Sequence, residues 1–335
     1  MIRTLIVDDS PLVRTIIRDF LESDGSFEII AEAENGFDGV TKAQRLNPDL
    51  VTMDIEMPMM NGLDAIVEIK KTVTTAIVVI STHDTAKMAY DATVKGAHEF
   101  FAKDIFTSQM SAQKKNEILS ALKQITSISK KIPVHRDAAK QAAVSPRRIQ
   151  CVVIAASTGG PIALCQLFTA LPQEFSVPIL LVQHNTSGFN RGLVQWLDEY
   201  TPLNVHLAEE KTVPIKGNIY VAPTDRHMVV YDNGIAFDDG EPVNNQKPAA
   251  DILFKSAASL YGDSLVSVVL TGMGSDGADG TRYVKQAGGV TIAQNEATSM
   301  IYGMPQAAAQ TGCVDIVLPL DEIAQRLILL TKGNV

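Results

Sequence analysis

The sequence predicts a two-domain α/β protein, and three observations lead to this prediction. With 335 residues, the chain is long enough for two domains that each bury a core. Short apolar runs alternate with amphipathic helical patterns, which favours parallel sheets covered by helices on both faces. Residues 126–149 interrupt this alternation with a net charge of +5, between parts with net charges of −6 and −8. We therefore expect domains at residues 1–126 and 150–335, joined by a basic linker at residues 127–149.

Residues 1–126 are predicted to form a doubly wound (βα)5 domain. Each apolar run is short and is followed by a helical repeat of about 3.6 residues, the pattern of parallel β-α-β units. The expected strands are residues 4–7, 27–31, 50–53, 76–81 and 99–102. The expected helices are residues 11–23, 36–46, 62–72, 85–95 and 113–126.

Polar side chains follow four of these strands. The acids are Asp8, Asp9 and Asp54, while Ser81 and Lys103 stand at or just after two further strand ends. Because the carboxyl ends of parallel strands share one edge of a sheet, the five side chains should converge. Three crowded carboxylates repel one another unless a divalent cation lies among them, and a phosphoryl group would use the lysine and hydroxyl. A solvated acidic patch would account for Asp8 and Asp9 alone, but not for the whole set.

Three motifs in this domain resemble the receiver domain of two-component response regulators. The match covers roughly residues 1–125 and predicts that a histidine kinase transfers phosphate to Asp54, making the chain a phosphoprotein. The motifs are Leu5-Ile-Val-Asp-Asp-Ser10, Asp54-Ile-Glu-Met-Pro-Met-Met-Asn-Gly62 and Phe101-Ala-Lys103.

The receiver resemblance also implies a Mg²⁺ site and partners for the phosphoryl group. The residues implied as Mg²⁺ ligands are Asp9, Asp54 and the backbone carbonyl of Glu56, with Asp8 assisting. The residues implied to contact the phosphoryl oxygens are Ser81 and Lys103.

Residues 150–335 are predicted to form a second, mainly parallel doubly wound α/β domain with hydrolytic chemistry. The turn Asp232-Asn-Gly234 is typical of a hairpin, so we expect a short antiparallel extension among the strands between about 205 and 238. The expected strands are residues 152–155, 179–183, 205–208, 218–221, 228–231, 235–237, 265–271, 290–293 and 314–317. The expected helices are residues 161–171, 188–200, 248–261, 279–287, 305–311 and 321–331.

Ser157 lies on a tight turn between a buried strand and a helix, within Cys151-Val-Val-Ile-Ala-Ala-Ser-Thr-Gly-Gly-Pro161. Nucleophiles of α/β hydrolytic enzymes occupy such turns. A Ser or Thr in this position can also simply cap the following helix. The local sequence alone does not choose between the cap and the nucleophile.

Two further strand ends carry chemistry that complements a serine nucleophile. His184 ends the apolar run of residues 178–183, so it is the favoured base, with His227 as the alternative. Residues 271–280 form a loop with four glycines, whose exposed N–H groups suit an oxyanion site. Asp276 and Asp279 in this loop are both placed to orient the histidine. A phosphate-binding loop is disfavoured, since the acids would repel an anion and no GK[ST] or GxGxxG pattern is present.

Residues 150–333 are similar to the catalytic domain of the CheB family of chemotaxis protein-glutamate methylesterases. The resemblance implies a Ser-His-Asp triad and selects Asp276 over Asp279. The implied triad is Ser157, His184 and Asp276, and the oxyanion donors are the backbone N–H of Met273 and, by the general rule for the residue after the nucleophile, of Thr158. The matching motifs are Ala156-Ser-Thr-Gly-Gly160, Gln183-His184, Tyr220-Val-Ala-Pro223, Asp225-Arg-His-Met228, Thr271-Gly-Met-Gly-Ser-Asp-Gly277, Ile292-Ala-Gln-Asn-Glu296 and Tyr302-Gly-Met-Pro305.

The two resemblances together imply a phosphorylation-activated esterase. It would demethylate glutamate methyl esters on chemotaxis receptors, and deamidate glutamines, to give adaptation. Mg²⁺ would serve the receiver, and the esterase reaction would need no cofactor. A response regulator whose second domain only binds a partner is the alternative. Segments 185–188 and 245–249 depart from the family pattern, which leaves the mouth of the cleft and the receptor preference open.

Composition excludes two other classes of function. Neither domain has the basic surface that a nucleic-acid-binding protein needs. No run approaches the roughly 18 apolar residues of a membrane span, and the N-terminus lacks the form of a signal peptide. We therefore expect a cytoplasmic protein that does not insert into the membrane, and the resemblance implies that it is recruited to receptor arrays.

Overall fold

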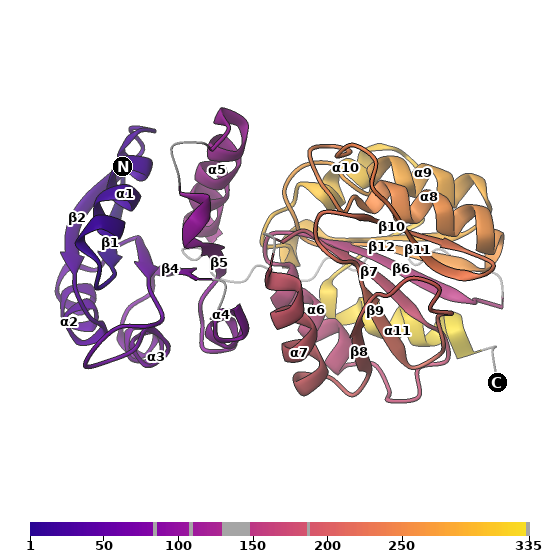
Figure 1. The fold of residues 1–335 in the computed structure, drawn as a ribbon, viewed down its shortest axis with the longest axis horizontal. Coiled ribbons are helices and arrows are strands. Elements are labelled where there is room, and N and C mark those ends of the chain that lie inside the picture. Colours follow the sequence, from indigo (N-terminus) through magenta and orange to yellow (C-terminus); the bar gives the residue numbers. More distant parts are fainter. Residues whose placement is uncertain (83–85, 107–109, 129–147, 186–187, 333–335) are drawn as a thin grey trace. The chain divides into compact units, whose positions relative to one another are not determined.

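A computed structural model describes residues 1–335 apart from 83–85, 107–109, 129–147, 186–187 and 333–335 (Figure 1). The chain divides into two compact units, Met1–Ile132 and Pro133–Val335. Most of the predicted linker lies outside the described residues. Within the described ranges, no helix is long and apolar enough to cross a membrane.

The first unit is a five-stranded parallel sheet in the order β2-β1-β3-β4-β5. Helices α1 and α5 lie on one side of this sheet and α2, α3 and α4 on the other (Figure 1), which confirms the predicted doubly wound (βα)5 fold. The strands are β1 (Ile2–Val7), β2 (Phe27–Ala33), β3 (Leu50–Met53), β4 (Ala76–Ser81) and β5 (Glu99–Ala102). The helices are α1 (Pro11–Glu22), α2 (Gly36–Leu46), α3 (Gly62–Thr72), α4 (Ala86–Val94) and α5 (Ala112–Ile128).

Local sequence signals explain where the first helices begin. The Ser10 side chain accepts a hydrogen bond from the backbone N–H of Val13, and Pro11 occupies the first turn of α1. In the same way, the side chain of Asn35 caps α2. Because only three residues separate the end of β1 from the start of α1, the acids between them are held at the carboxyl edge of the sheet.

The second unit contains a seven-stranded parallel sheet in the order β14-β13-β12-β6-β7-β9-β8. Helices α8, α9 and α10 cover one face and α6, α7 and α11 the other (Figure 1). The strands are β6 (Cys151–Ala156), β7 (Ile179–Gln183), β8 (Asn204–Leu207), β9 (Asn218–Val221), β12 (Leu265–Val269), β13 (Val290–Gln294) and β14 (Ile316–Leu318). The helices are α6 (Gly160–Thr169), α7 (Phe189–Tyr200), α8 (Ala250–Tyr261), α9 (Ala278–Gln286), α10 (Met304–Gln310) and α11 (Leu320–Thr331).

The antiparallel part of the second unit is the hairpin of β10 (His227–Tyr231) and β11 (Gly234–Asp238). Tyr231 pairs with Gly234, so the turn has two residues, as its sequence predicts. The hairpin forms its own two-stranded sheet. Residues 205–208 and 218–221 were also expected in this extension, but β8 and β9 instead pair in parallel within the main sheet and are joined by residues 208–217 rather than by a tight turn.

The strand order reverses at β6, which lies between β12 and β7. Strands later in the chain add on one side of β6 through β12, while β7 pairs directly on its other side. In open α/β sheets, ligands bind at the carboxyl ends of strands where the strand order reverses in this way. The turns after β12, β6 and β7 are therefore the first place to look for a site.

Candidate active site and carboxylate cluster

The turn that carries Ser157 is built by close backbone contacts. The N–H of Ser157 donates to the carbonyl of Thr271 at 3.0 Å, so the pairing of β6 and β12 continues past the last strand residue. Gly159, at φ +74°, is the N-cap of α6, and a Cβ on Gly160 would lie 2.1 Å from the Oε1 of Gln183. Since Gly159 occupies the cap position, Ser157 is not the N-cap of α6.

His184 and Asp276 form a buried pair. The backbone N–H of His184 donates to the carbonyl of Ala156 at 3.0 Å, which places His184 beside the serine turn. Its Nε2 lies 2.7 Å from the Oδ2 of Asp276, and the two side chains are 6% and 2% exposed. The carboxylate of Asp276 thus orients the imidazole, the choice between Asp276 and Asp279 that the resemblance implied.

The second nitrogen of His184 faces inward without a partner. Nδ1 is buried and makes no hydrogen bond to any described residue, so the hydrogen bond expected between Ser157 and His184 is not formed in this structure. With the Nε2 proton held by Asp276, Nδ1 is the nitrogen that can accept a proton. Catalytic hydrogen bonds of this kind often tighten only when substrate binds.

Asp276 is held by more than the histidine. Its carboxylate accepts hydrogen bonds from the backbone N–H groups of Ala250 at 2.6 Å, Asp251 at 3.0 Å and Gly277 at 3.0 Å. Burial opposes ionisation, but the hydrogen bonds and charge of His184 and the N–H donors keep the pKa of Asp276 below its ordinary value. Asp276 is therefore an anion fixed in place.

The alternatives to His184 and Asp276 lie elsewhere. His227 is buried with both ring nitrogens bound to backbone: Nε2 lies 3.0 Å from the carbonyl of Glu241, and Nδ1 accepts from the N–H of Ala249 at 3.0 Å. Asp279 is 72% exposed and pairs with Arg282 at 3.4 Å. Neither residue takes part in the pair formed by His184 and Asp276.

The glycine loop after β12 lies directly against the serine. A Cβ on Gly272 would be 2.7 Å from the Cβ of Ser157 and 2.4 Å from the sulfur of Met304, so only glycine fits. The loop is tied down by the N–H of Gly272, which donates to the carbonyl of Ile301 at 3.0 Å. Gly272 and Ser157 are in contact, and the predicted oxyanion donors, Met273 and Thr158, are the residues that follow them. Their role remains a prediction.

The sequence indicated no role for the side chain of Gln183, although its motif matched the family. The side chain is buried, and its Nε2 donates to the carbonyl of Ser157 at 3.0 Å and to that of His184 at 2.9 Å. One amide thus bridges the backbones of the serine and the histidine. The signal in the sequence was a glutamine ending an otherwise apolar strand, because a buried polar residue needs hydrogen-bond partners.

The first unit brings together the acids that its sequence predicted. Carboxylate oxygens of Asp8, Asp9 and Asp54 all lie within 4.8 Å of one another. The Nζ of Lys103 lies 2.7 Å from the Oδ2 of Asp54 and 2.9 Å from that of Asp8. Ser81, buried at the end of β4, pairs in register with Ala102, the residue before Lys103. The three acids and Lys103 thus lie together, and the register of β4 and β5 places Ser81 at the same edge of the sheet.

Charge in this cluster is not balanced by Lys103 alone. Burial and the nearby charge of Asp8 raise the pKa of Asp54 to about 6, although Lys103 and the N–H of Ile55 favour its ionised form. Three carboxylates with one exposed member provide the oxygen donors that Mg²⁺ prefers. The residues present therefore fit a Mg²⁺ ion bound by Asp8, Asp9 and Asp54.

Comparisons with known proteins agree with both sites. The family model of the CheB methylesterase matches residues 152–327, and that of the response regulator receiver domain matches residues 4–114. A protein of Pyrococcus abyssi named protein-glutamate methylesterase/protein-glutamine glutaminase is 39% identical, over 98% of this chain and 93% of that protein. A protein of the same name from Clostridium acetobutylicum is 37% identical, over 99% and 98%.

Among solved structures, the CheB methylesterase catalytic domain of Thermotoga maritima is similar to the second unit. It is 37% identical with a TM-score of 0.53, and the match covers 55% of this chain and 100% of that one. The identity, the coverage and the two matching models agree with each other and with the geometry. This chain belongs to the CheB methylesterase family and carries a response regulator receiver domain.

Proposed function

We propose that this protein demethylates glutamate methyl esters on chemotaxis receptors, deamidates receptor glutamines, and so gives adaptation. The observation that carries the proposal is the buried pair of His184 and Asp276 beside the serine turn. The relatives named protein-glutamate methylesterase/protein-glutamine glutaminase support the choice of substrate.

In the proposed reaction, the Oγ of Ser157 attacks the ester carbonyl while Nδ1 of His184 takes the hydroxyl proton. Asp276 stabilises the imidazolium that forms. The oxyanion would receive hydrogen bonds from the N–H groups of Met273 and Thr158. His184 returns the proton to the leaving methanol, and water then hydrolyses the acyl-enzyme. Deamidation follows the same steps with ammonia as the leaving group.

The receiver cluster supports control of this reaction by phosphorylation of Asp54. A histidine kinase would supply the phosphoryl group, which adds about −1.5 to −2 charge. Ser81 and Lys103 would contact its oxygens. Asp8, Asp9, Asp54 and the carbonyl of Glu56 would hold Mg²⁺, which when bound neutralises charge on the transferring group. With receptors as substrates, the protein would act in the cytoplasm at receptor arrays.

The catalytic proposal is tested by methanol release from methylated receptor with the full chain. We expect Ser157→Ala to abolish release, because the nucleophile is lost. Ser259→Ala, an exposed serine on α8, is the matched control and should behave as the wild-type protein. Turnover by Ser157→Ala at the wild-type rate would contradict the mechanism.

The regulatory proposal is tested in the same assay with and without a small-molecule phosphodonor. We expect the donor to accelerate methanol release by the wild-type protein. Asp54→Asn should keep the basal rate and lose the response, since the phosphoacceptor is gone. Asp104→Asn, an exposed acid next to Lys103, should keep the response. An Asp54→Asn protein that still responds would rule out Asp54 as the switch.

A further inference from the structure

A second carboxylate, Asp251, is built into the support of Asp276. Asp276 accepts the N–H groups of Ala250 and Asp251 at the start of α8, while the Oδ1 of Asp251 accepts the N–H groups of Gly277 at 2.9 Å and Gly280 at 2.6 Å, at the start of α9. Each acid therefore caps the helix that begins beside the other. Carboxylates are stabilised at helix N-termini because the free N–H groups point at them.

The reciprocal caps lie where the two helices meet. A Cβ on Gly280 would lie 2.6 Å from the Cβ of Phe254 and 3.1 Å from the Cα of Asp251, so the helices touch at this point. Asp251 is 7% exposed and Asp276 is 2% exposed. A displacement of Asp251 would therefore be passed to the loop that carries Asp276, because buried side chains leave no free space to absorb it.

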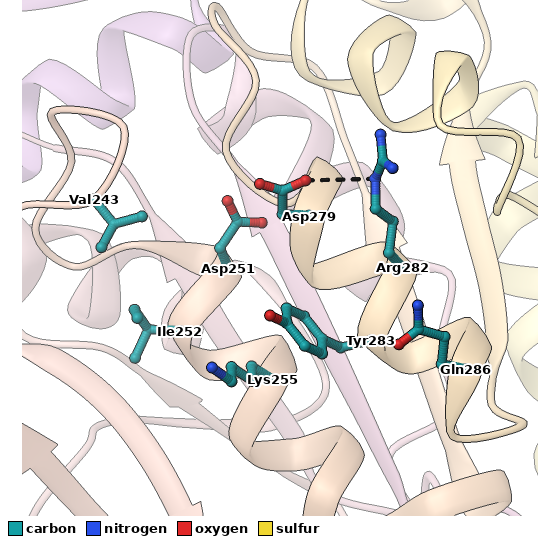
Figure 2. A pocket seen from close by; sticks show the side chains of 8 residues that line it. All are labelled: Val243, Asp251, Ile252, Lys255, Asp279, Arg282, Tyr283 and Gln286. Atoms are coloured by element: carbon teal, nitrogen blue, oxygen red, sulfur yellow. Dashed lines mark ion pairs between the residues drawn. The ribbon is translucent and has the colours of Figure 1, made fainter.

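The far side of Asp251 faces a pocket. Its Oδ2 accepts a hydrogen bond from the Nδ2 of Asn244 at 2.7 Å. Figure 2 shows Asp251 on the wall of this pocket, near Asp279 and the ion pair that Asp279 makes with Arg282. The pocket has a volume of about 460 Å³. Its lining residues are Val243, Asp251, Ile252, Lys255, Asp279, Arg282, Tyr283 and Gln286.

We propose that Asp251 is a positioning residue: it holds the loop of Asp276, and its charge acts through Asp276 on the base His184. The proposal rests on the proposed function, in which Asp276 orients that base. The hydrogen bonds of Asp251 go to Asn244, Asp276, Gly277 and Gly280 and not to His184 or Ser157, so its influence passes through the two caps. A sequence offers no sign of this role, since an acid in the first turn of a helix commonly only favours the helix dipole.

The charge of Asp251 changes near pH 6. Burial, together with the negative charge of Asp276, raises the pKa of Asp251 to about 6. The other charges around the pocket are Asp279, which also raises the pKa of Asp251, Lys255 on the same helix as Asp251, and Arg282 on α9. Above about pH 6, Asp251 therefore adds a second negative charge behind Asp276.

A serine-reactive fluorophosphonate tests the proposal, because its labelling of Ser157 in the full chain reports the nucleophile and base without any receptor. The second-order labelling rate would be measured from pH 5 to 8 for each variant. For Asp251→Ala we expect a rate about 10- to 100-fold lower, since the loop loses its cap. For Asp251→Asn, which keeps the shape but does not titrate, we expect a smaller loss and an acid limb that shifts because the titration of Asp251 near pH 6 is gone.

Gln286→Ala is the matched control, because it changes an exposed residue of the same pocket without removing a charge or touching the caps; its rate and acid limb should match the wild-type protein. Unchanged rates and acid limbs in both Asp251 variants would overturn the proposal, as would an equal loss at every pH in Asp251→Asn without a shift. If Asp251→Ala does not fold, Asp251→Asn alone decides. A wild-type protein that is not labelled at Ser157 would instead overturn the proposed function, and the role of Asp251 with it.

Discussion

The carboxylate cluster of the first unit and the site around Asp276 use the same position in the fold in opposite electrostatic ways. In the cluster, three acids share one lysine, and the pKa of Asp54 rises to about 6. In the second unit, three backbone N–H groups and His184 surround Asp276 and keep its pKa low. The first arrangement calls for an added cation, whereas in the second the partners of the carboxylate are already in place and only the hydrogen bond between Ser157 and His184 is still to form. This difference suits a switch in one unit and a preorganised catalyst in the other.

The largest effect should come from breaking the completed site with Asp276→Asn. The amide cannot stabilise an imidazolium and can present an N–H to Nε2, which would force the wrong tautomer on His184. We expect kcat for methanol release to fall by about 10⁴-fold, the loss seen when the orienting acid of a serine protease is replaced by its amide. Asp279→Asn is the control, and an Asp276→Asn protein within tenfold of wild type would show that the carboxylate is dispensable.

The two units also treat a buried histidine differently, which predicts the next effect. His98 has no carboxylate partner in the recorded contacts: burial and the charge of Lys70 lower its pKa to about 4, and its Nδ1 accepts the N–H of Ile77. In the unfolded chain, His98 would become protonated below its ordinary pKa of 6.5, whereas in the folded protein it stays neutral until about pH 4. Stability of the first unit is therefore retained above pH 6.5 and lost as pH falls toward 4.

This loss should reach about 3 kcal/mol at pH 4, since each pH unit contributes at most about 1.4 kcal/mol. Hydrogen exchange of the first-unit strands in the full chain would measure it at several pH values. His98→Gln should flatten the dependence, because glutamine does not titrate. His206→Gln, an exposed histidine of the second unit, is the control. An identical pH dependence in His98→Gln would contradict the assignment.

Removing the amide that joins the serine and histidine backbones should have a smaller effect. Gln183→Ala removes the donor to the His184 carbonyl, leaves the Ser157 carbonyl with only the N–H of Gly160, and opens a buried space. We therefore expect about 2 kcal/mol lower stability of the second unit and a lower kcat. Fluorescence of Trp196, the single tryptophan, follows unfolding of this unit in denaturant. Gln173→Ala, at an exposed position, should change neither. An unchanged unfolding midpoint would show that the two hydrogen bonds contribute nothing.

Short-range sequence patterns predicted most of the helices and strands and most of the candidate residues of each site. Strands β3, β4, β5, β7 and β9 and helices α2 and α3 have the predicted bounds, because apolar runs and helix caps are short-range signals. Ser157 and His184 were candidates because each follows a strand and strand ends share an edge, whereas the family resemblance was needed to choose Asp276 over Asp279. Asp251 escaped prediction because it lies 25 residues from Asp276 and its partners are backbone N–H groups, which leave no mark on the sequence. The position of β9 between β7 and β8 likewise depends on pairing between distant segments.

The smallest predicted effect is the stabilisation of the first unit by Mg²⁺ bound to Asp8, Asp9 and Asp54. Mg²⁺ at ten times its dissociation constant should stabilise this unit by about 1.4 kcal/mol, because binding to the folded form alone shifts the equilibrium by mass action. Asp9→Asn should abolish the gain by removing an exposed ligand, whereas Asp104→Asn should retain it. Hydrogen exchange of the first-unit strands would measure the gain, and Trp196 fluorescence should show no Mg²⁺ effect on the second unit. A first unit indifferent to Mg²⁺ would mean that Lys103 balances the three acids by itself, and the contrast between the two sites would then disappear.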